Sequence, residues 1–140
     1  MRRFLVVANQ TLGGEHLIEK VRDCMSREPS SFYLLVPASP PHDAHAWSEG
    51  QTRAVAEQRL AEGIAKFHEI GAEVDGEVGD TNPAHAVGDV CLVRQFDEVI
   101  VSTLPIGVSR WLKQDLPHKI RRQVGVPVTH IVAEHADVSS

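Results

Sequence analysis

The chain has 140 residues, of which 42% are hydrophobic and 24% are charged, and its formal net charge is -5. A chain of this length forms one domain, and the composition is typical of a soluble globular protein rather than a disordered, fibrous or membrane protein. The negative net charge argues against a protein that binds nucleic acid.

The start of the chain is similar to a signal peptide, because the basic residues Arg2 and Arg3 precede an apolar run at 4–8. That run ends at Asn9, which is too early for the hydrophobic region of a signal peptide or for a membrane span. We therefore predict that residues 4–8 form the first strand of a cytoplasmic protein.

Five apolar runs occur along the chain, and segments of helical period separate them. Each run is continuous rather than alternating with polar residues, as expected for strands that are covered on both faces. The alternation of strand and helix predicts right-handed crossovers and a parallel, doubly wound α/β sheet. The predicted strands are residues 4–8, 32–37, 73–78, 97–102 and 126–132.

The first two helices have clear end signals. One helix begins after the glycines at 13–14 and ends before Pro29. The next begins at Ser48, with Gln51 three residues later as in a capping box, and stops at Gly71. The glycines at 13–14 lack the spacing of a phosphate-binding turn, and they favour a plain helix start.

The later helices are shorter. Asn82 and Pro83 provide a cap and a first-turn proline for a third helix. Pro117 separates a short turn that begins at Ser109 from a last helix that runs to Gly125. Lys119, Arg121 and Arg122 give that helix a cationic end, which favours its dipole over a nucleic-acid patch.

The two cysteines and most histidines carry no evident chemistry. We expect Cys24 and Cys91 to be buried thiols on apolar helix faces, rather than a disulfide or a catalytic cysteine. His130 is a candidate interface residue, and no catalytic Ser-His-Asp or Cys-His arrangement follows from residue order. The remaining histidines outside residues 39–47 are expected at the surface: His16, His68, His85, His118 and His135.

Residues 39–47 follow the second predicted strand and form a candidate lid over the carboxyl edge of the sheet. This segment contains His42, Asp43 and His45, the only close cluster that the eight histidines of the chain form. A loop does not impose the rigid spacing of a helix, so we expect a solvated loop and no metal site.

Ligands of a doubly wound sheet bind at the carboxyl ends of the strands, where the strand order reverses. Between the first and fourth strands this places residues 8–10 opposite Ser102 and Thr103. Asn9 has both a donor and an acceptor and can therefore bind a base or an amide; alternatively, it closes the turn after the strand.

The chain resembles the universal stress protein family in element order over nearly its whole length. The resemblance is strongest at Gly79, Asp80 and Pro83, at residues 97–103 and at residues 126–128. It implies a five-stranded parallel domain, with strand order 3-2-1-4-5 and helices on both faces, that pairs with a second copy through its last strand. Many members of the family bind ATP.

The family's phosphate-binding pattern is a glycine, two residues, a second glycine, nine residues, then a glycine followed by serine or threonine, with an aspartate ending the first strand. In this sequence Asn9 replaces the aspartate, and Ser102 and Pro105 replace the first two glycines. The last pair falls on 114–115, or on 115–116. No glycine of the pattern is kept in register.

These replacements predict that the chain does not bind ATP in the family's usual way. Pro105 has no backbone donor and a fixed φ, which does not suit a phosphate-binding nest. We also expect Asp115 to cap the following helix, so that its carboxylate occupies the helix end that a phosphate would use. Like charge would then repel a triphosphate.

The segment after the fourth strand still offers hydroxyl groups and a guanidinium for a smaller or less charged ligand. The alternative is that Ser109 caps a helix, Trp111 packs beneath it and Arg110 is solvated. The candidate ligand-binding residues are Ala8, Asn9, Gln10, Val36, Pro37, Val101, Ser102, Thr103, Gly107, Val108, Ser109, Arg110 and Asp115.

We therefore predict a stress-protein-like, non-enzymatic protein that binds a ligand or partner and has a degenerate nucleotide site, no metal and no required cofactor. One alternative is that ATP or AMP binds between Asn9, Val36 and the 102–110 loop. A second is a small hydrolase or transferase that uses histidines at the strand ends.

An apolar last strand would leave an exposed edge in a monomer, so we predict a homodimer with interface residues Val126, Val128, His130 and Val132.

Overall fold

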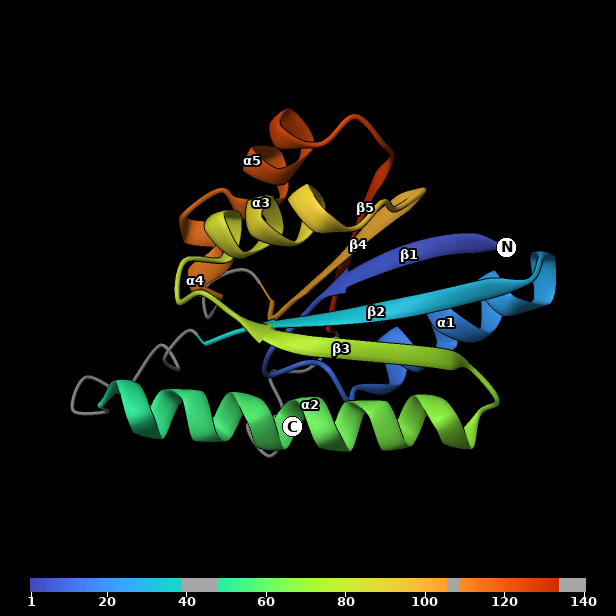
Figure 1. Cartoon of the computed structure of the whole chain (residues 1–140), viewed down its shortest axis with the longest axis horizontal. Coiled ribbons are helices and arrows are strands. Elements are labelled where there is room, and N and C mark those ends of the chain that lie inside the picture. Colours follow the sequence, from blue (N-terminus) through green and yellow to red (C-terminus); the bar gives the residue numbers. More distant parts are fainter. Residues whose placement is uncertain (39–47, 106–108, 134–140) are drawn as a thin grey trace.

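The computed structural model describes residues 1–38, 48–105 and 109–133, except for the side chains of residues 49 and 110. These residues include a five-stranded parallel sheet of order β3-β2-β1-β4-β5, which confirms the predicted fold class and strand order (Figure 1). The elements are β1 (Arg2–Val7), α1 (Glu15–Arg27), β2 (Ser30–Pro37), α2 (Glu49–Glu69), β3 (Glu73–Gly79), α3 (Pro83–Val93), β4 (Glu98–Thr103), α4 (Arg110–Lys113), α5 (Leu116–Gln123) and β5 (Val128–Val132).

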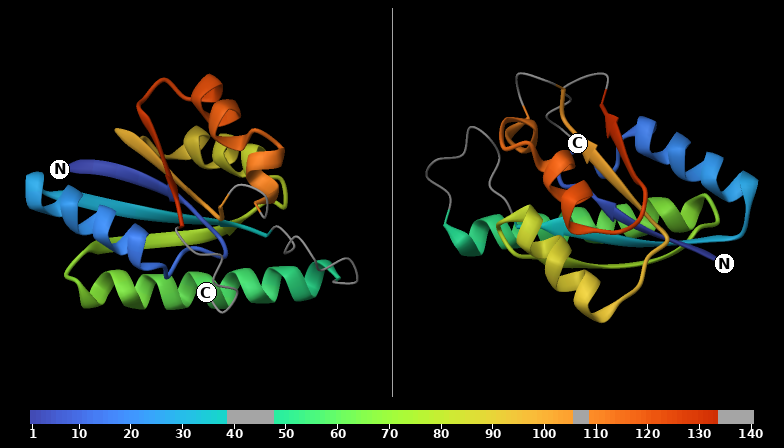
Figure 2. Two further views of the ribbon diagram at one scale, coloured as in Figure 1. Left: turned by 180° about the vertical axis from the view of Figure 1, so that it is seen from behind. Right: turned by 90° about the horizontal axis from the view of Figure 1, so that it is seen from above.

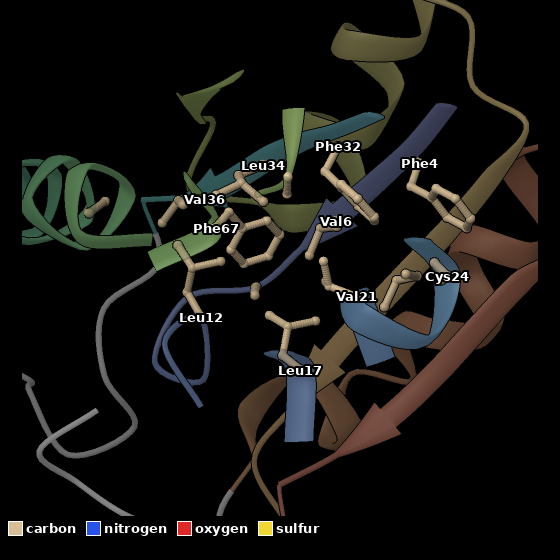
Figure 3. Packing of buried hydrophobic residues seen from close by; sticks show 14 of the residues in the cluster. Phe4, Val6, Leu12, Leu17, Val21, Cys24, Phe32, Leu34, Val36 and Phe67 are labelled. Atoms are coloured by element: carbon tan, nitrogen blue, oxygen red, sulfur yellow. The ribbon is translucent and has the colours of Figure 1, made fainter. Parts of the chain in front are cut away.

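Helices cover both faces of the sheet, as Figures 1 and 2 show. Helices α1 and α2 pack on one face, where Phe32 stacks on Phe4 with ring centroids 5.2 Å apart and meets Phe67 of α2 edge-on at 5.9 Å (Figure 3). On the other face, α3, α4 and α5 bury Leu5 and Val101. This two-sided burial explains why the central strands are continuous apolar runs.

The edge strand β3 differs from that pattern. Glu73 and Asp75 are exposed and the rest of the strand is only partly buried. Strand β3 hydrogen-bonds to β2 on one side, and its acidic residues are typical of an edge strand that is protected against pairing with another chain.

The predicted helix ends are largely confirmed. Ser48 and Gln51 form the capping box of α2, and Asn82 accepts hydrogen bonds from the first amides of α3. Gly71, with φ of +84°, follows the end of α2 in the left-handed conformation that glycine adopts readily. Helix α5 ends before Gly125, where Val124 already has an extended backbone. No helix in the described ranges is both long and apolar enough to cross a membrane.

The prediction for the cysteines is right for one residue and wrong for the other. Cys24 is buried in the core, whereas Cys91 is exposed. Next to Cys91, Leu92 and Val93 are 84% and 78% exposed, beside an open hollow of about 720 Å³ at the amino edge of the sheet. Helix α3 is apolar on nearly all sides, so hydrophobicity alone does not indicate which side it buries.

Candidate functional site

The carboxyl ends of β1 and β4 meet, and a buried hydrogen-bond network joins them. The Ser102 hydroxyl lies 2.6 Å from the Thr11 hydroxyl and 3.0 Å from Nε2 of His16. The sequence analysis placed residues 8–10 opposite Ser102, but the contacts come from the next turn and from α1. His16 was expected to be a simple surface residue, and it is instead half-buried and bonded to Ser102.

Asn9 connects three elements at this edge. It is 8% exposed, its side-chain nitrogen donates to the Pro37 carbonyl at 2.8 Å, and its side-chain oxygen accepts from the guanidinium of Arg59 in α2. Its backbone carbonyl also accepts from Leu12, which closes the turn after β1. The Asn9 backbone therefore closes the turn, whereas its side chain bonds to β2 and α2, and ligand binding by Asn9 stays a prediction.

Arg59 was missed by the sequence analysis. It is half-buried, and burial lowers the pKa of its guanidinium, an effect that the nearby Glu62 carboxylate opposes. A signal for it was present, because Arg59 falls within a helical series whose other members are buried: Thr52, Ala56, Gly63 and Phe67. An arginine within a buried helix stripe indicates a polar contact across the core.

The side chains of the apolar candidate residues are buried in the core, so these residues can offer only backbone groups to a ligand at this edge of the sheet. Ala8, Val36 and Val101 are fully or almost fully buried in the two hydrophobic clusters. Pro37 offers its carbonyl, which Asn9 already engages, and Gln10 is half-buried.

Thr103 and His130 bond to each other across the last two strands. Thr103 Oγ1 lies 2.8 Å from His130 Nε2, and the Thr103 carbonyl accepts from the amide of Ala133. Burial lowers the pKa of His130, and the positive charge of Arg121 lowers it further. His130 thus has a partner within its own chain, while its role in an interface stays a prediction.

The described residues after β4 form hydrogen bonds with one another. The Ser109 amide donates to the Pro105 carbonyl at 3.1 Å, and the Ser109 hydroxyl accepts from the Leu112 amide at 3.2 Å. The Asp115 amide donates to the Leu112 carbonyl. Ser109 therefore caps α4, as one interpretation predicted, and Trp111 is buried in the core.

The prediction that the Asp115 carboxylate caps α5 is wrong. Asp115 precedes α5 with φ of 57° and ψ of 39°, and its side chain makes no capping hydrogen bond. A side-chain cap normally requires an extended backbone, which aims the carboxylate at the first free amides of the helix. In the left-handed conformation the Asp115 carboxylate is not directed at those amides, so it does not block the amino end of α5 as we expected.

Several candidates lie outside the described part of the chain: Gly107, Val108, the side chain of Arg110, the lid segment 39–47 with His42, Asp43 and His45, and His135. Among the described residues, no group of three or more histidine, cysteine or acidic side chains is placed to hold a metal ion. In that same part of the chain, every buried side-chain nitrogen or oxygen has a hydrogen-bond partner.

No family model and no curated protein sequence matches the chain. Solved structures do match it. A universal stress protein in complex with cAMP has a TM-score of 0.66 at 12% identity, covering 95% of this chain and 98% of that one. A universal stress protein family protein from Arabidopsis thaliana with AMP bound has a TM-score of 0.67 at 14% identity, covering 100% and 99%.

A third similar structure, a universal stress protein from Archaeoglobus fulgidus, has a TM-score of 0.58 at 13% identity and covers 94% of this chain and 93% of that one. At these identities the likeness concerns the backbone rather than the site residues. The protein has the universal stress protein fold.

Proposed function

We propose that the protein is a non-catalytic ligand-binding protein, whose site lies at the carboxyl ends of β1 and β4 and does not hold ATP on a phosphate loop. The observation that carries this proposal is the hydrogen bonding among the described residues that follow β4. A phosphate loop needs several backbone amides that point at the anion. Here Pro105 has no amide hydrogen, and the amides of Ser109, Leu112 and Asp115 donate within the segment.

Freeing those amides for a triphosphate would break bonds that each stabilise the fold by about 1 kcal/mol. The hydroxyl groups of Ser102, Thr103 and Ser109 are likewise engaged with neighbours. The segment is therefore better suited to a ligand that does not depend on a cradle of amides.

The ligand class that we propose is a nucleoside monophosphate. Two of the similar structures hold cAMP or AMP, and they cover nearly all of this chain. A single phosphate needs fewer donors than a triphosphate, so it is compatible with a segment that has lost its glycines. We propose a stress-response role on the ground of the fold that the chain shares with universal stress proteins.

We do not propose hydrolysis by Ser102 and His16, although their side chains are within hydrogen-bond distance. Ser102 is 1% exposed, and its hydroxyl is shared with Thr11. A nucleophile must reach the reacting atom of its substrate, which a fully buried hydroxyl does not.

We also propose a cytoplasmic homodimer that pairs through β5. Among the described residues, this strand is at the edge of the sheet and pairs with β4 alone, and its last residue, Val132, is 39% exposed. Val126, Val128 and His130 are half-buried. A second copy of β5 would satisfy the free edge. A monomeric mass in sedimentation at micromolar concentration would contradict this part of the proposal.

Calorimetric titration of nucleotide-free protein with AMP and with adenosine tests the ligand class. We expect saturable binding of AMP, and we expect AMP to appear by chromatography in the supernatant when freshly purified protein is denatured. Absence of heat with both compounds, together with no released nucleotide, would overturn the nucleotide assignment.

A further inference from the structure

We infer that Arg59 of α2 binds the anionic group of the ligand at this edge of the sheet, in place of a phosphate loop after β4. The inference rests on the proposed function, because it assigns the charge recognition of that same site. Arg59 lies in α2, whereas the family's phosphate-binding pattern falls on the residues after β4.

The first step concerns the charge of Arg59. Its guanidinium is half-buried and donates to the side-chain oxygen of Asn9, which is a neutral amide. None of the ion pairs within the described residues involves Arg59. The Glu62 carboxylate favours the charged form of Arg59, but Glu62 is exposed to water, which screens this interaction. A cation withdrawn from water without a close counter-charge favours an anion beside it.

The second step explains why position 9 is neutral. The side-chain nitrogen of Asn9 donates to the Pro37 carbonyl at 2.8 Å. An aspartate in the same place would bring a carboxylate oxygen against that carbonyl, and two acceptors cannot bond to each other. The contact that ties β1 to the end of β2 thus requires an amide, and an amide leaves the charge of Arg59 uncompensated.

The third step concerns the donors that remain. A guanidinium has five N–H donors in a planar fork, and one Arg59 nitrogen is engaged by Asn9. The others suit the paired oxygens of a phosphate or a carboxylate. The amides of Ser109 and Asp115 donate to carbonyls of their own segment, whereas Arg59 is a described cation that contacts the residue directly after β1.

The experiment has two arms on the folded chain of 140 residues. In the first, inorganic phosphate is titrated to tens of millimolar while NMR follows the Arg59 Nε–H and Asn9 side-chain amide signals. In the second, AMP and adenosine are titrated calorimetrically into the parent, Arg59→Gln, Asn9→Asp and the control Arg53→Gln. Arg53 lies on the same helix, but it is exposed and paired with Glu57.

We expect phosphate to shift the Arg59 and Asn9 signals in a saturable way, and Asn9→Asp to abolish the Arg59 shift because its carboxylate takes the place of the anion. AMP should bind about tenfold more weakly to Arg59→Gln than to the parent, while adenosine binding stays unchanged. Arg53→Gln should behave as the parent. If Arg59→Gln does not fold, the phosphate arm on the parent and the Asn9→Asp variant still decide.

The outcomes separate the two proposals. A phosphate shift at Arg59 without binding of AMP or adenosine supports the anion site and overturns the nucleotide class. Binding of AMP that is as tight in Arg59→Gln as in the parent overturns the inference and leaves the nucleotide class standing. No phosphate shift at Arg59 and no nucleotide binding overturns both.

Discussion

The hydrogen bond between Thr11 and Ser102 should hold the turn after β1 against the end of β4. The two hydroxyls are 2.6 Å apart and their residues are 3% and 1% exposed. A buried neutral hydrogen bond contributes about 1 kcal/mol to the free energy of unfolding, and a stranded partner costs about 1–3 kcal/mol. Thr11→Val keeps the shape of the side chain and removes the hydroxyl, so we expect it to destabilise the fold by about 1–2 kcal/mol.

A double-mutant cycle isolates the bond between the two residues. Ser102→Ala also removes the bond to His16, but that loss is present in both backgrounds and cancels. Urea denaturation of the parent, Thr11→Val, Ser102→Ala and the double variant should show a coupling of about 1 kcal/mol. Ser26→Ala, which removes an exposed hydroxyl, should change stability by less than about 0.5 kcal/mol. A coupling within about 0.3 kcal/mol of zero would refute the idea that this network positions the site.

Three further predictions concern single residues outside the site. Burial and a 2.7 Å hydrogen bond to Glu77 raise the pKa of Tyr33 to about 12. Because Tyr33 is the only tyrosine, phenolate absorbance should titrate near that value in the folded protein and near 10 in the unfolded protein. The free energy of unfolding should therefore decline as the pH rises from 10 towards 12. Alkylation of the native protein should modify exposed Cys91 and spare buried Cys24 until unfolding, which peptide mass spectrometry would check. Phe67→Ala, at a fully buried side chain, should lower the free energy of unfolding by about 3–5 kcal/mol in urea denaturation, and a loss below about 1 kcal/mol would contradict the packing described.

The fold was predictable because local signals and tertiary burial agree. The apolar residues 99–101 are buried from both faces of the sheet, and the capping signals at Ser48 and Asn82 depend on contacts within three residues. Asp115 shows the limit of such signals. Its residue type suits a cap, but a left-handed backbone sets the side-chain direction, and composition does not reveal that conformation.

For the candidate site, the sequence predicts the position in the sheet but not the side chains that contact one another there. Rules for parallel sheets place the candidate site at the ends of β1 and β4, and the structure brings Ser102 and Thr11 together at that edge. Arg59 and His16 come from helices, and their contacts with Asn9 and Ser102 join residues 50 and 86 positions apart. Such contacts depend on how helices pack on the sheet. Helical periodicity indicates that Arg59 faces the sheet, but it gives no such signal for His16.

We propose that the protein binds its ligand without an ATP phosphate loop. The most direct measurement is calorimetric titration of magnesium-ATP into the parent and into a variant with Pro105→Gly, Gln114→Gly and Asp115→Ser. This variant introduces the second glycine of the pattern and, one residue closer than in the pattern, its final Gly-Ser pair. The account predicts no saturable heat from the parent below about 1 mM and measurable binding by the variant. Micromolar binding of magnesium-ATP by the parent would contradict it.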